Sequence, residues 1–146
     1  MRERSRARGW ALQILYAWES RGRGSSLDAV LAEFERERHI ARDSRMFLAK
    51  LVHAVDAHVA EIDRTVEEAL TNWRLERLSV IDRNILRLAA AEMLYVEDVP
   101  PRVSIQEAIV LAEKYGTADS PRFVNGVLDA LLRRIEGRSP ARRAGE

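Results

Sequence analysis

The sequence predicts an all-α protein, folded as one domain of about seven helices. Apolar residues recur at helical spacing in every long segment of the chain. Breaks rich in Gly, Pro and Ser separate these segments, and no stretch shows the alternation typical of a strand. A length of 146 residues with 47% hydrophobic content suits a single core. We expect the domain to span residues 1–136 and residues 137–146 to form a basic, disordered tail.

The first half of the chain contains three apolar stripes. A helix is expected over about residues 4–20, with its core stripe formed by Ala7, Ala11, Ile14, Leu15 and Trp18. The segment 22–26 breaks this helix, and a short helix follows over 27–34, with Ser26 as its N-cap. The third stripe runs from 47 to 70, which is long for one ordinary helix. We therefore expect a break near 58–63, although that segment contains neither Gly nor Pro.

Capping signals mark two later helices. Ser79, followed three residues later by Asp82, resembles a capping box and starts a helix that must end before Pro100. Ser104 and Glu107 fit the capping box itself, so the next helix is expected to begin there.

The last helix is expected to follow Gly116, which suits a left-handed C-terminal position of the preceding helix. Ser120 before Pro121 places a capping residue ahead of the first helical position. The apolar pattern then continues to 137, and Gly126 within it predicts a close contact between two helices.

Charge is distributed unevenly, although the net charge is only +1. Residues 1–24 carry +4 and residues 137–146 carry +2, whereas residues 25–136 carry −5. Basic ends of this kind suit a nucleic acid, and the acidic body suits a basic protein partner.

Four arginines, Arg2, Arg4, Arg6 and Arg8, open the first helix. Cations at a helix N-terminus are unfavourable by ~0.3–1 kcal/mol each when exposed, which favours an external anion such as RNA phosphate. The alternative is a frayed basic terminus without a ligand. Trp10 lies off the core stripe, where it suits either stacking on RNA bases or a place in the core.

A second surface of the first helix carries Leu12, Tyr16 and Glu19. If exposed, an apolar residue and an aromatic residue together mark a surface for a protein partner. Glu76 and Asp82 are carboxylates that suit a basic partner, although acidic residues are also common at helix starts.

Enzyme, metal and membrane signatures are missing from the sequence. It has no Gly-rich phosphate loop, no cysteine and no zinc-binding helix, and His53 and His58 do not share a helix face. We therefore expect no catalytic residue, no metal and no cofactor. The charged N-terminus lacks the apolar region of a signal peptide, and no apolar run approaches the ~20 residues of a membrane span. A cytoplasmic protein is expected.

Six stretches together resemble the NusB family of bacterial transcription antitermination factors. They are Arg-Ala-Arg at 6–8, Ala-Leu-Gln-Ile-Leu-Tyr at 11–16, Leu-Ser-Val-Ile-Asp-Arg-Asn-Ile-Leu-Arg-Leu-Ala at 78–89, Asp-Val-Pro at 98–100, Ile-Gln-Glu-Ala at 105–108 with Leu-Ala at 111–112, and Phe-Val-Asn-Gly-Val-Leu-Asp at 123–129. They occur in the family's order over nearly the whole chain.

The resemblance implies an all-α fold of two packed halves without enzymatic activity. Members of the family pair with NusE, a small-subunit ribosomal protein, and bind the boxA element of nascent RNA. The pair then joins the antitermination complex of RNA polymerase and supports rRNA transcription. The family includes monomers and homodimers, so the oligomeric state stays open.

The resemblance also implies site residues. The RNA-facing set is Arg2, Arg4, Arg6, Arg8, Gln13, Asp119, Ser120, Arg122 and Phe123, and the NusE-facing set is Tyr16, Glu76 and Asp82. Phe123 fits RNA contact and core packing equally well. A related domain precedes the catalytic domain of an rRNA cytosine methyltransferase family, but residues 1–146 include no methyl-donor domain. The alternative function is a helical adaptor without specific RNA recognition.

Overall fold

The computed structural model describes residues 2–138 as six α-helices and one short 3-10 helix. They are α1 (Arg2–Ser20), α2 (Leu27–Glu37), α3 (Arg42–Ala69), η1 (Leu75–Arg77), α4 (Val80–Tyr95), α5 (Pro101–Tyr115) and α6 (Ser120–Arg138). This part of the chain contains no strand, so the all-α class is confirmed. The expected tail over 137–146 lies, from residue 139 onward, outside the described residues.

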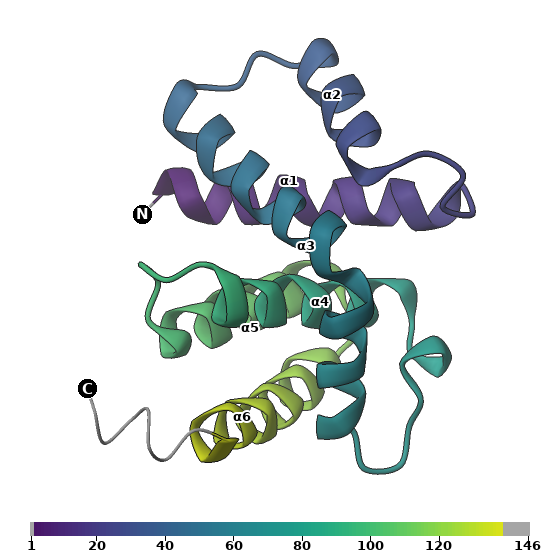
Figure 1. The fold of residues 1–146 in the computed structure, drawn as a ribbon, viewed down its shortest axis with the longest axis vertical. Coiled ribbons are helices and arrows are strands. Elements are labelled where there is room, and N and C mark those ends of the chain that lie inside the picture. The colour runs from purple at the N-terminus through teal and green to yellow at the C-terminus, as the bar shows by residue number, and fades with distance from the viewer. Residues whose placement is uncertain (1, 139–146) are drawn as a thin grey trace.

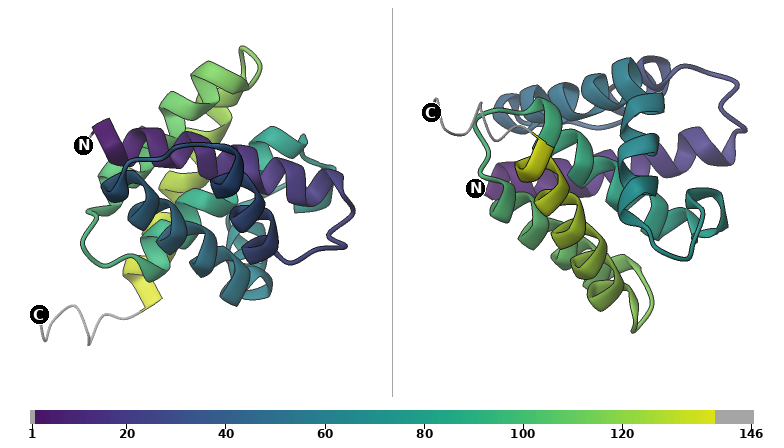
Figure 2. Two further views of the ribbon diagram at one scale, coloured as in Figure 1. Left: turned by 90° about the horizontal axis from the view of Figure 1, so that it is seen from above. Right: turned by 60° about the horizontal axis from the view of Figure 1, so that its bottom comes forward.

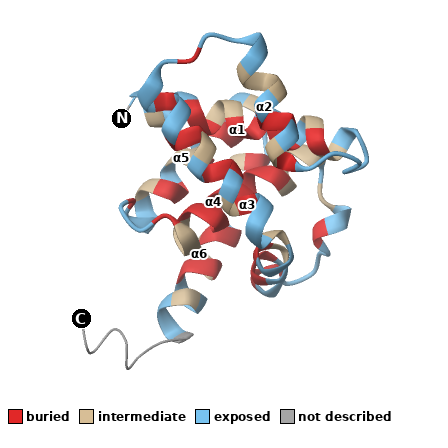
Figure 3. Cartoon of the chain, turned by 45° about the horizontal axis from the view of Figure 1, so that its top comes forward, coloured by how far each residue is buried: buried red, intermediate tan, exposed pale blue. Residues whose placement is uncertain are grey.

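The helices form two groups joined by α3 (Figure 1). α1, α2 and the first part of α3 pack together, and α4, α5 and α6 pack together. α3 and α4 make the most extensive contact, and α1 packs on both of them. The buried residues lie where these helices face one another (Figure 3). No helix within residues 2–138 has the length and apolar character that a membrane crossing requires.

α3 accounts for the difference between six α-helices and the expected seven. His58 has φ −131° and ψ 26°, outside the helical region, and the helix continues on both sides of it. The imidazole stacks on the ring of Tyr95 at the end of α4, with centroids 4.0 Å apart and planes 9° apart. The break expected near 58–63 is therefore a bend within one helix, because no Gly or Pro ends it there.

Of the four predicted N-caps, those at Ser26 and Ser79 are confirmed and those at Ser104 and Ser120 are wrong. α6 already includes Ser120, whose hydroxyl accepts a hydrogen bond from the preceding Thr117 N–H rather than from the helix ahead. The hydroxyls of Ser26 and Ser79 each accept a hydrogen bond from the backbone N–H three residues later, at 3.1 Å. α5 does not begin at Ser104 but at Pro101, with Pro100 in an extended conformation before it. Proline is favoured at the first helical position, and this preference outweighs the capping box. Ser104 is instead a buried residue within α5, and its hydroxyl faces Glu92 of α4.

Gly116 and Gly126 both differ from the expectation. Gly116 has φ −92° rather than a left-handed conformation. A Cβ there would lie 2.9 Å from the carbonyl oxygen of Ala112 and closer still to the Ser120 hydroxyl, so the turn into α6 has no room for a side chain. Gly126 is exposed, and a Cβ there would meet no atom within 4 Å, so it makes no close helix contact.

The core stripe of α1 is wider than expected. All five predicted positions are buried, and Leu12, which was expected on an exposed face, is also only 2% exposed. α1 packs against α2 and α3 on one side and against α4 and α5 on another. Its buried surface therefore covers more than one apolar stripe, while Tyr16 remains exposed.

Candidate nucleic-acid interface

A surface groove runs between α1 and the last turn of α5. α1 contributes Arg2, Arg6, Trp10 and Gln13, and α5 contributes Lys114 and Tyr115. The spacing of four, four and three residues puts the α1 side chains on one helix face. None of the residues that line this groove is acidic. We call this site the α1–α5 groove.

The positive charge of the α1–α5 groove is not neutralised by the protein. Arg2 and Arg6 are exposed, and neither forms an ion pair with a carboxylate within residues 2–138. The Lys114 ammonium lies 5.3 Å from the ring centroid of Tyr115. Three cations without an ion-pair partner raise the local potential and attract an anion such as phosphate.

Two aromatic rings lie in the floor of the groove. Trp10 and Tyr115 are both half-buried, and each packs against the core with part of its ring accessible. The Tyr115 hydroxyl lies close to Gly9, where a Cβ would be 3.9 Å away. Trp10 therefore combines the two roles that the sequence left open, because it contacts the core and lines the groove. Partly exposed rings beside cations are suited to stacking with unpaired bases.

Arg8 does not join this surface. Its side chain is 4% exposed, and its Nε and Nη2 donate to Glu92 at 2.8 and 2.7 Å while its Nη1 donates to Glu107 at 2.7 Å. The Ser104 hydroxyl donates to the same Glu92 carboxylate at 2.6 Å. This position does not support the RNA contact expected for Arg8. The guanidinium instead joins α1 to α4 and α5, and so fixes the two walls of the groove relative to each other.

Arg4 is also engaged within the protein, although less completely. It donates to Asp98 at 2.7 Å, and its guanidinium lies 4.6 Å from the ring centroid of Phe47. The hydrogen bond from Arg4 lowers the pKa of the Asp98 carboxyl below its ordinary value. A third of the Arg4 side chain stays exposed, at 34%. Of the four N-terminal arginines, Arg2 and Arg6 are thus the two that face solvent freely.

The start of α6 follows closely on the Tyr115 end of the groove. Asp119 and Arg122 are exposed there. Ser120 is 1% exposed, and its hydroxyl accepts a hydrogen bond from the Thr117 backbone N–H at 3.0 Å. Phe123 is half-buried and packs against the core. In this region the exposed charge of Arg122 is therefore the group most accessible to an RNA, and Ser120 serves the turn.

The residues expected to contact a protein partner are accessible to different degrees. Tyr16 is 47% exposed. The Glu76 side chain is 72% exposed, and its one ion pair within the described part of the chain is with Arg74 at 3.6 Å. Asp82 is half-buried, and its Oδ1 is enclosed without a hydrogen-bond partner among residues 2–138. Tyr16 and Glu76 are consequently more accessible than Asp82.

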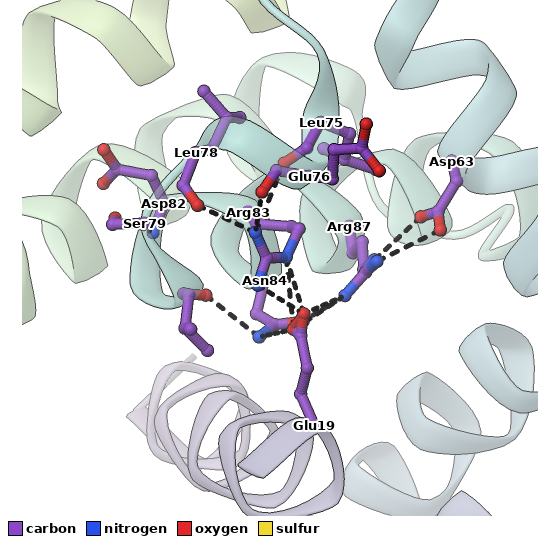
Figure 4. A network of polar contacts seen from close by, with 11 residues as sticks. Glu19, Asp63, Leu75, Glu76, Leu78, Ser79, Asp82, Arg83, Asn84 and Arg87 are labelled. Carbon is purple, nitrogen blue, oxygen red and sulfur yellow. Dashed lines mark hydrogen bonds and ion pairs between the residues drawn. The ribbon is translucent and has the colours of Figure 1, made fainter. Parts of the chain in front are cut away.

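A network of polar contacts at Glu19 underlies this partner surface (Figure 4). Glu19 accepts hydrogen bonds from Arg83 at 2.6 Å, Arg87 at 3.1 Å and Asn84 at 3.2 Å. Arg87 also donates to both oxygens of Asp63, at 2.7 and 3.1 Å. Burial alone would raise the pKa of Glu19, but the hydrogen bond from Arg83 and the charges of Arg87 and Arg83 lower it overall.

Arg83 extends the network to η1. Its Nη1 donates to the carbonyl oxygens of Leu75 and Glu76 at 3.3 Å and of Leu78 at 2.7 Å. Arg83 therefore ties η1, which carries Glu76, to the α1 turn that carries Glu19 and Tyr16. The sequence analysis identified Glu19 only as a surface residue, because nothing in the local pattern shows that Arg83 and Arg87 face it.

Comparisons with known proteins give one consistent result. The sequence profile of the NusB family matches residues 5–133. The transcription antitermination protein NusB of Anaeromyxobacter sp. (strain Fw109-5) is 44% identical, over 97% of this chain and 95% of that protein. The NusB protein of Sorangium cellulosum (strain So ce56) is 42% identical, over 92% and 95%.

Solved structures agree with this result. T. maritima NusB superimposes with a TM-score of 0.82 at 36% identity, covering 89% of this chain and 90% of that one. A crystal structure of the antitermination factors NusB and NusE in complex with double-stranded RNA matches with a TM-score of 0.82 at 32% identity, covering 92% and 98%.

Proposed function

Because the chain belongs to the NusB family, we propose that it is a transcription antitermination factor that binds boxA-type RNA together with NusE and supports processive rRNA transcription. The family consists of RNA-binding transcription factors rather than enzymes. The observation that carries the proposal is the α1–α5 groove, where three cations and two aromatic rings meet without a lining carboxylate.

Each group in the groove has a distinct part in the proposed binding. Arg2 and Arg6 contact phosphates, which set the position of the RNA and supply affinity. Trp10 and Tyr115 stack on unpaired bases, and the amide of Gln13 can hydrogen-bond a base edge.

The remaining RNA-facing candidates either lie beside the α1–α5 groove or support the helices that form it. Arg122, with Asp119 and Phe123 beside it, lies in the first turn of α6, where free backbone N–H groups also favour phosphate. Arg4 and Arg8 hold α1 in place, and Ser120 shapes the turn before α6.

The proposed NusE surface consists of Tyr16, Glu76 and Asp82. Its carboxylates suit a basic ribosomal protein, and its exposed tyrosine is a residue type enriched in interface hot spots. Glu76 is the better test position, because Asp82 sits in the first turn of α4, where a carboxylate also stabilises the helix.

The RNA proposal is tested with a boxA-like RNA and a scrambled RNA, with and without NusE, over a range of salt concentrations. We expect a preference for boxA that strengthens with NusE and weakens with salt. Arg6→Ala should weaken binding and lower the slope of log K against log salt by ~0.7, the value for one phosphate on a single strand. Arg134→Ala, an exposed arginine on α6, is the matched control and should bind like the wild type.

Two results would count against the proposal. Equal affinity of Arg6→Ala and wild type for boxA would remove Arg6 from the RNA surface. No boxA preference under any condition, with little response to salt, would favour the adaptor function instead.

NusE binding is tested by calorimetry on Glu76→Lys. The substitution places a cation against a basic partner, so we expect NusE affinity to fall while affinity for RNA alone is retained. Glu136→Lys on α6 changes charge equally at another exposed position and should leave NusE affinity unchanged. Equal NusE affinity of Glu76→Lys and wild type would exclude Glu76 from the interface.

A further inference from the structure

A second basic surface lies where α2 passes into α3. Residues 36–45 contain Arg36, Arg38, Arg42 and Arg45 but only two acidic residues. All four arginines are exposed, and none forms an ion pair with a carboxylate within residues 2–138. Four positive charges against two negative ones leave an excess of positive charge, which favours binding of an anion from outside the chain. We call residues 36–45 the basic corner.

The basic corner is hollowed rather than flat. Arg36 and Arg38 from the end of α2, His39 from the connection and Arg45 from the first turn of α3 line one depression. Glu35 is the single carboxylate among the lining residues. Three arginines that line one depression can contact neighbouring phosphates of one strand.

An aromatic bridge connects the basic corner to the α1–α5 groove. The ring of Trp10, which lines the groove, lies 6.5 Å from the ring of Phe34 on α2, at an interplanar angle of 59°. The Arg38 guanidinium lies 4.3 Å from the centroid of the same Phe34 ring. Trp10, Phe34 and Arg38 therefore form a continuous path from the groove to the corner.

The start of α3 is also fixed beside the start of α1. The Ser44 hydroxyl donates to the carbonyl oxygen of Glu3 at 3.3 Å. Seen from above, the connection between α2 and α3 lies over α1 (Figure 2), at the end of the molecule that is farthest from α6 (Figure 1). α1 thus has the groove with α5 on one side and the basic corner on the other.

We propose that the basic corner is a second phosphate-binding site, which takes the RNA backbone beyond the part held in the α1–α5 groove. This extension rests on the proposed RNA-binding function. RNA leaving the groove crosses Trp10 and Phe34, and its phosphates then bind Arg38 and Arg45. Phosphate contacts carry no sequence information, so the corner adds affinity and fixes the path of the strand without changing base preference.

The test compares Arg38→Ala/Arg45→Ala with the matched control Arg133→Ala/Arg134→Ala, which removes two exposed arginines from α6. Binding is measured by fluorescence anisotropy with a short boxA-like RNA and with the same RNA extended at either end, over a series of salt concentrations. On one of the extended RNAs the corner variant should lower the salt slope by ~1.4, or ~0.7 for each lost contact on a single strand.

Three further measurements test the same proposal. On the short RNA the corner variant should bind like the control, and its ratio of boxA affinity to scrambled affinity should equal that of the wild type. Arg38→Lys/Arg45→Lys keeps the charge and should retain most of the wild-type slope. Thermal unfolding should be unchanged in all three variants, because the substituted side chains are exposed.

The inference is overturned if the corner variant and the control have the same slope on both extended RNAs. A loss of NusE affinity with RNA affinity unchanged would also overturn it and assign the corner to a protein contact. Failure of the proposed function looks different, since in that case the wild type itself shows no preference for boxA over scrambled RNA.

Discussion

Replacing Arg8 tests whether this residue stabilises the fold or contacts RNA. Glu92 on α4 is 3% exposed, and Arg8→Ala removes the α1 cation that neutralises its carboxylate. Glu107 loses the same partner but is 18% exposed and keeps access to water. The main cost of the substitution is therefore an unpaired charge at Glu92.

The magnitude follows from the burial of this pair. Removing one partner of a buried ion pair typically costs ~3–5 kcal/mol. A chain of this size loses ~2–4 °C in melting temperature per kcal/mol, so the melting temperature should fall by roughly 6–20 °C. Arg6→Ala removes an exposed side chain and should change stability by less than ~0.5 kcal/mol. The two arginines are two residues apart and differ mainly in which helix face they occupy.

Arg8→Met combined with Glu92→Gln is the compensated variant. It removes both charges and keeps an amide oxygen that can accept the Ser104 hydroxyl, so it should recover at least ~2 kcal/mol of the loss in Arg8→Ala. Urea unfolding measures the stability of each variant, and anisotropy measures RNA affinity where each is folded. The compensated variant should bind RNA nearly as the wild type does.

Two outcomes would refute the interior role of Arg8. One is an unfolding free energy for Arg8→Ala within ~0.5 kcal/mol of that for Arg6→Ala. The other is a compensated variant that folds well but loses as much RNA affinity as Arg6→Ala, since this would show direct contact between Arg8 and RNA.

Two further predictions concern Glu19 and the glycines. The pKa of Glu19 is lowered in the folded state, so its stabilising contribution is complete above its ordinary value of 4.5 and is lost as the pH falls through the lower folded pKa. Between pH 7 and pH 3 the wild type should therefore lose more unfolding free energy than Glu19→Gln, and parallel losses in urea titrations would contradict this. Gly116→Ala should cost ~1–3 kcal/mol because its Cβ meets the Ser120 hydroxyl and the Ala112 carbonyl. Gly126→Ala should instead add ~0.5–1 kcal/mol from helix propensity, and equal melting temperatures for the two variants would refute the steric argument.

Local patterns predicted the helices well where local interactions decide the structure. Apolar periodicity identified every α-helix, and the caps at Ser26 and Ser79 depend only on residues within one turn. The start of α5 was wrong because Pro101 and Ser104 offered competing signals within the same turn. The reason for Gly116 could not be predicted, since it depends on the folding of Ser120 back over the turn.

The candidate site was predictable on one side only. The cations on α1 could be identified from sequence, whereas Lys114 and Tyr115 join them through a packing of α1 against α5 that no local pattern shows. The buried position of Arg8 was not predicted from the sequence. In the structure it shares a buried face with Ala11 and Leu12, three and four residues later, whereas the sequence analysis assigned Arg8 to the RNA-facing set and expected Leu12 to be exposed. Its partners Glu92 and Glu107 were needed to explain how a charge is accommodated there.

The helical period also explains why the four alternating N-terminal arginines have two different environments. Arg2 and Arg6 are four residues apart and share the face toward the groove, whereas Arg4 and Arg8 share the opposing face toward Asp98, Glu92 and Glu107. The inward pair meets carboxylates from later in the chain, and this offsets its unfavourable position at a helix N-terminus. The outward pair keeps that unfavourable charge, which an RNA phosphate would neutralise. A substitution that changes RNA affinity without changing stability should therefore come from Arg2 or Arg6, and one that changes stability first should come from Arg8.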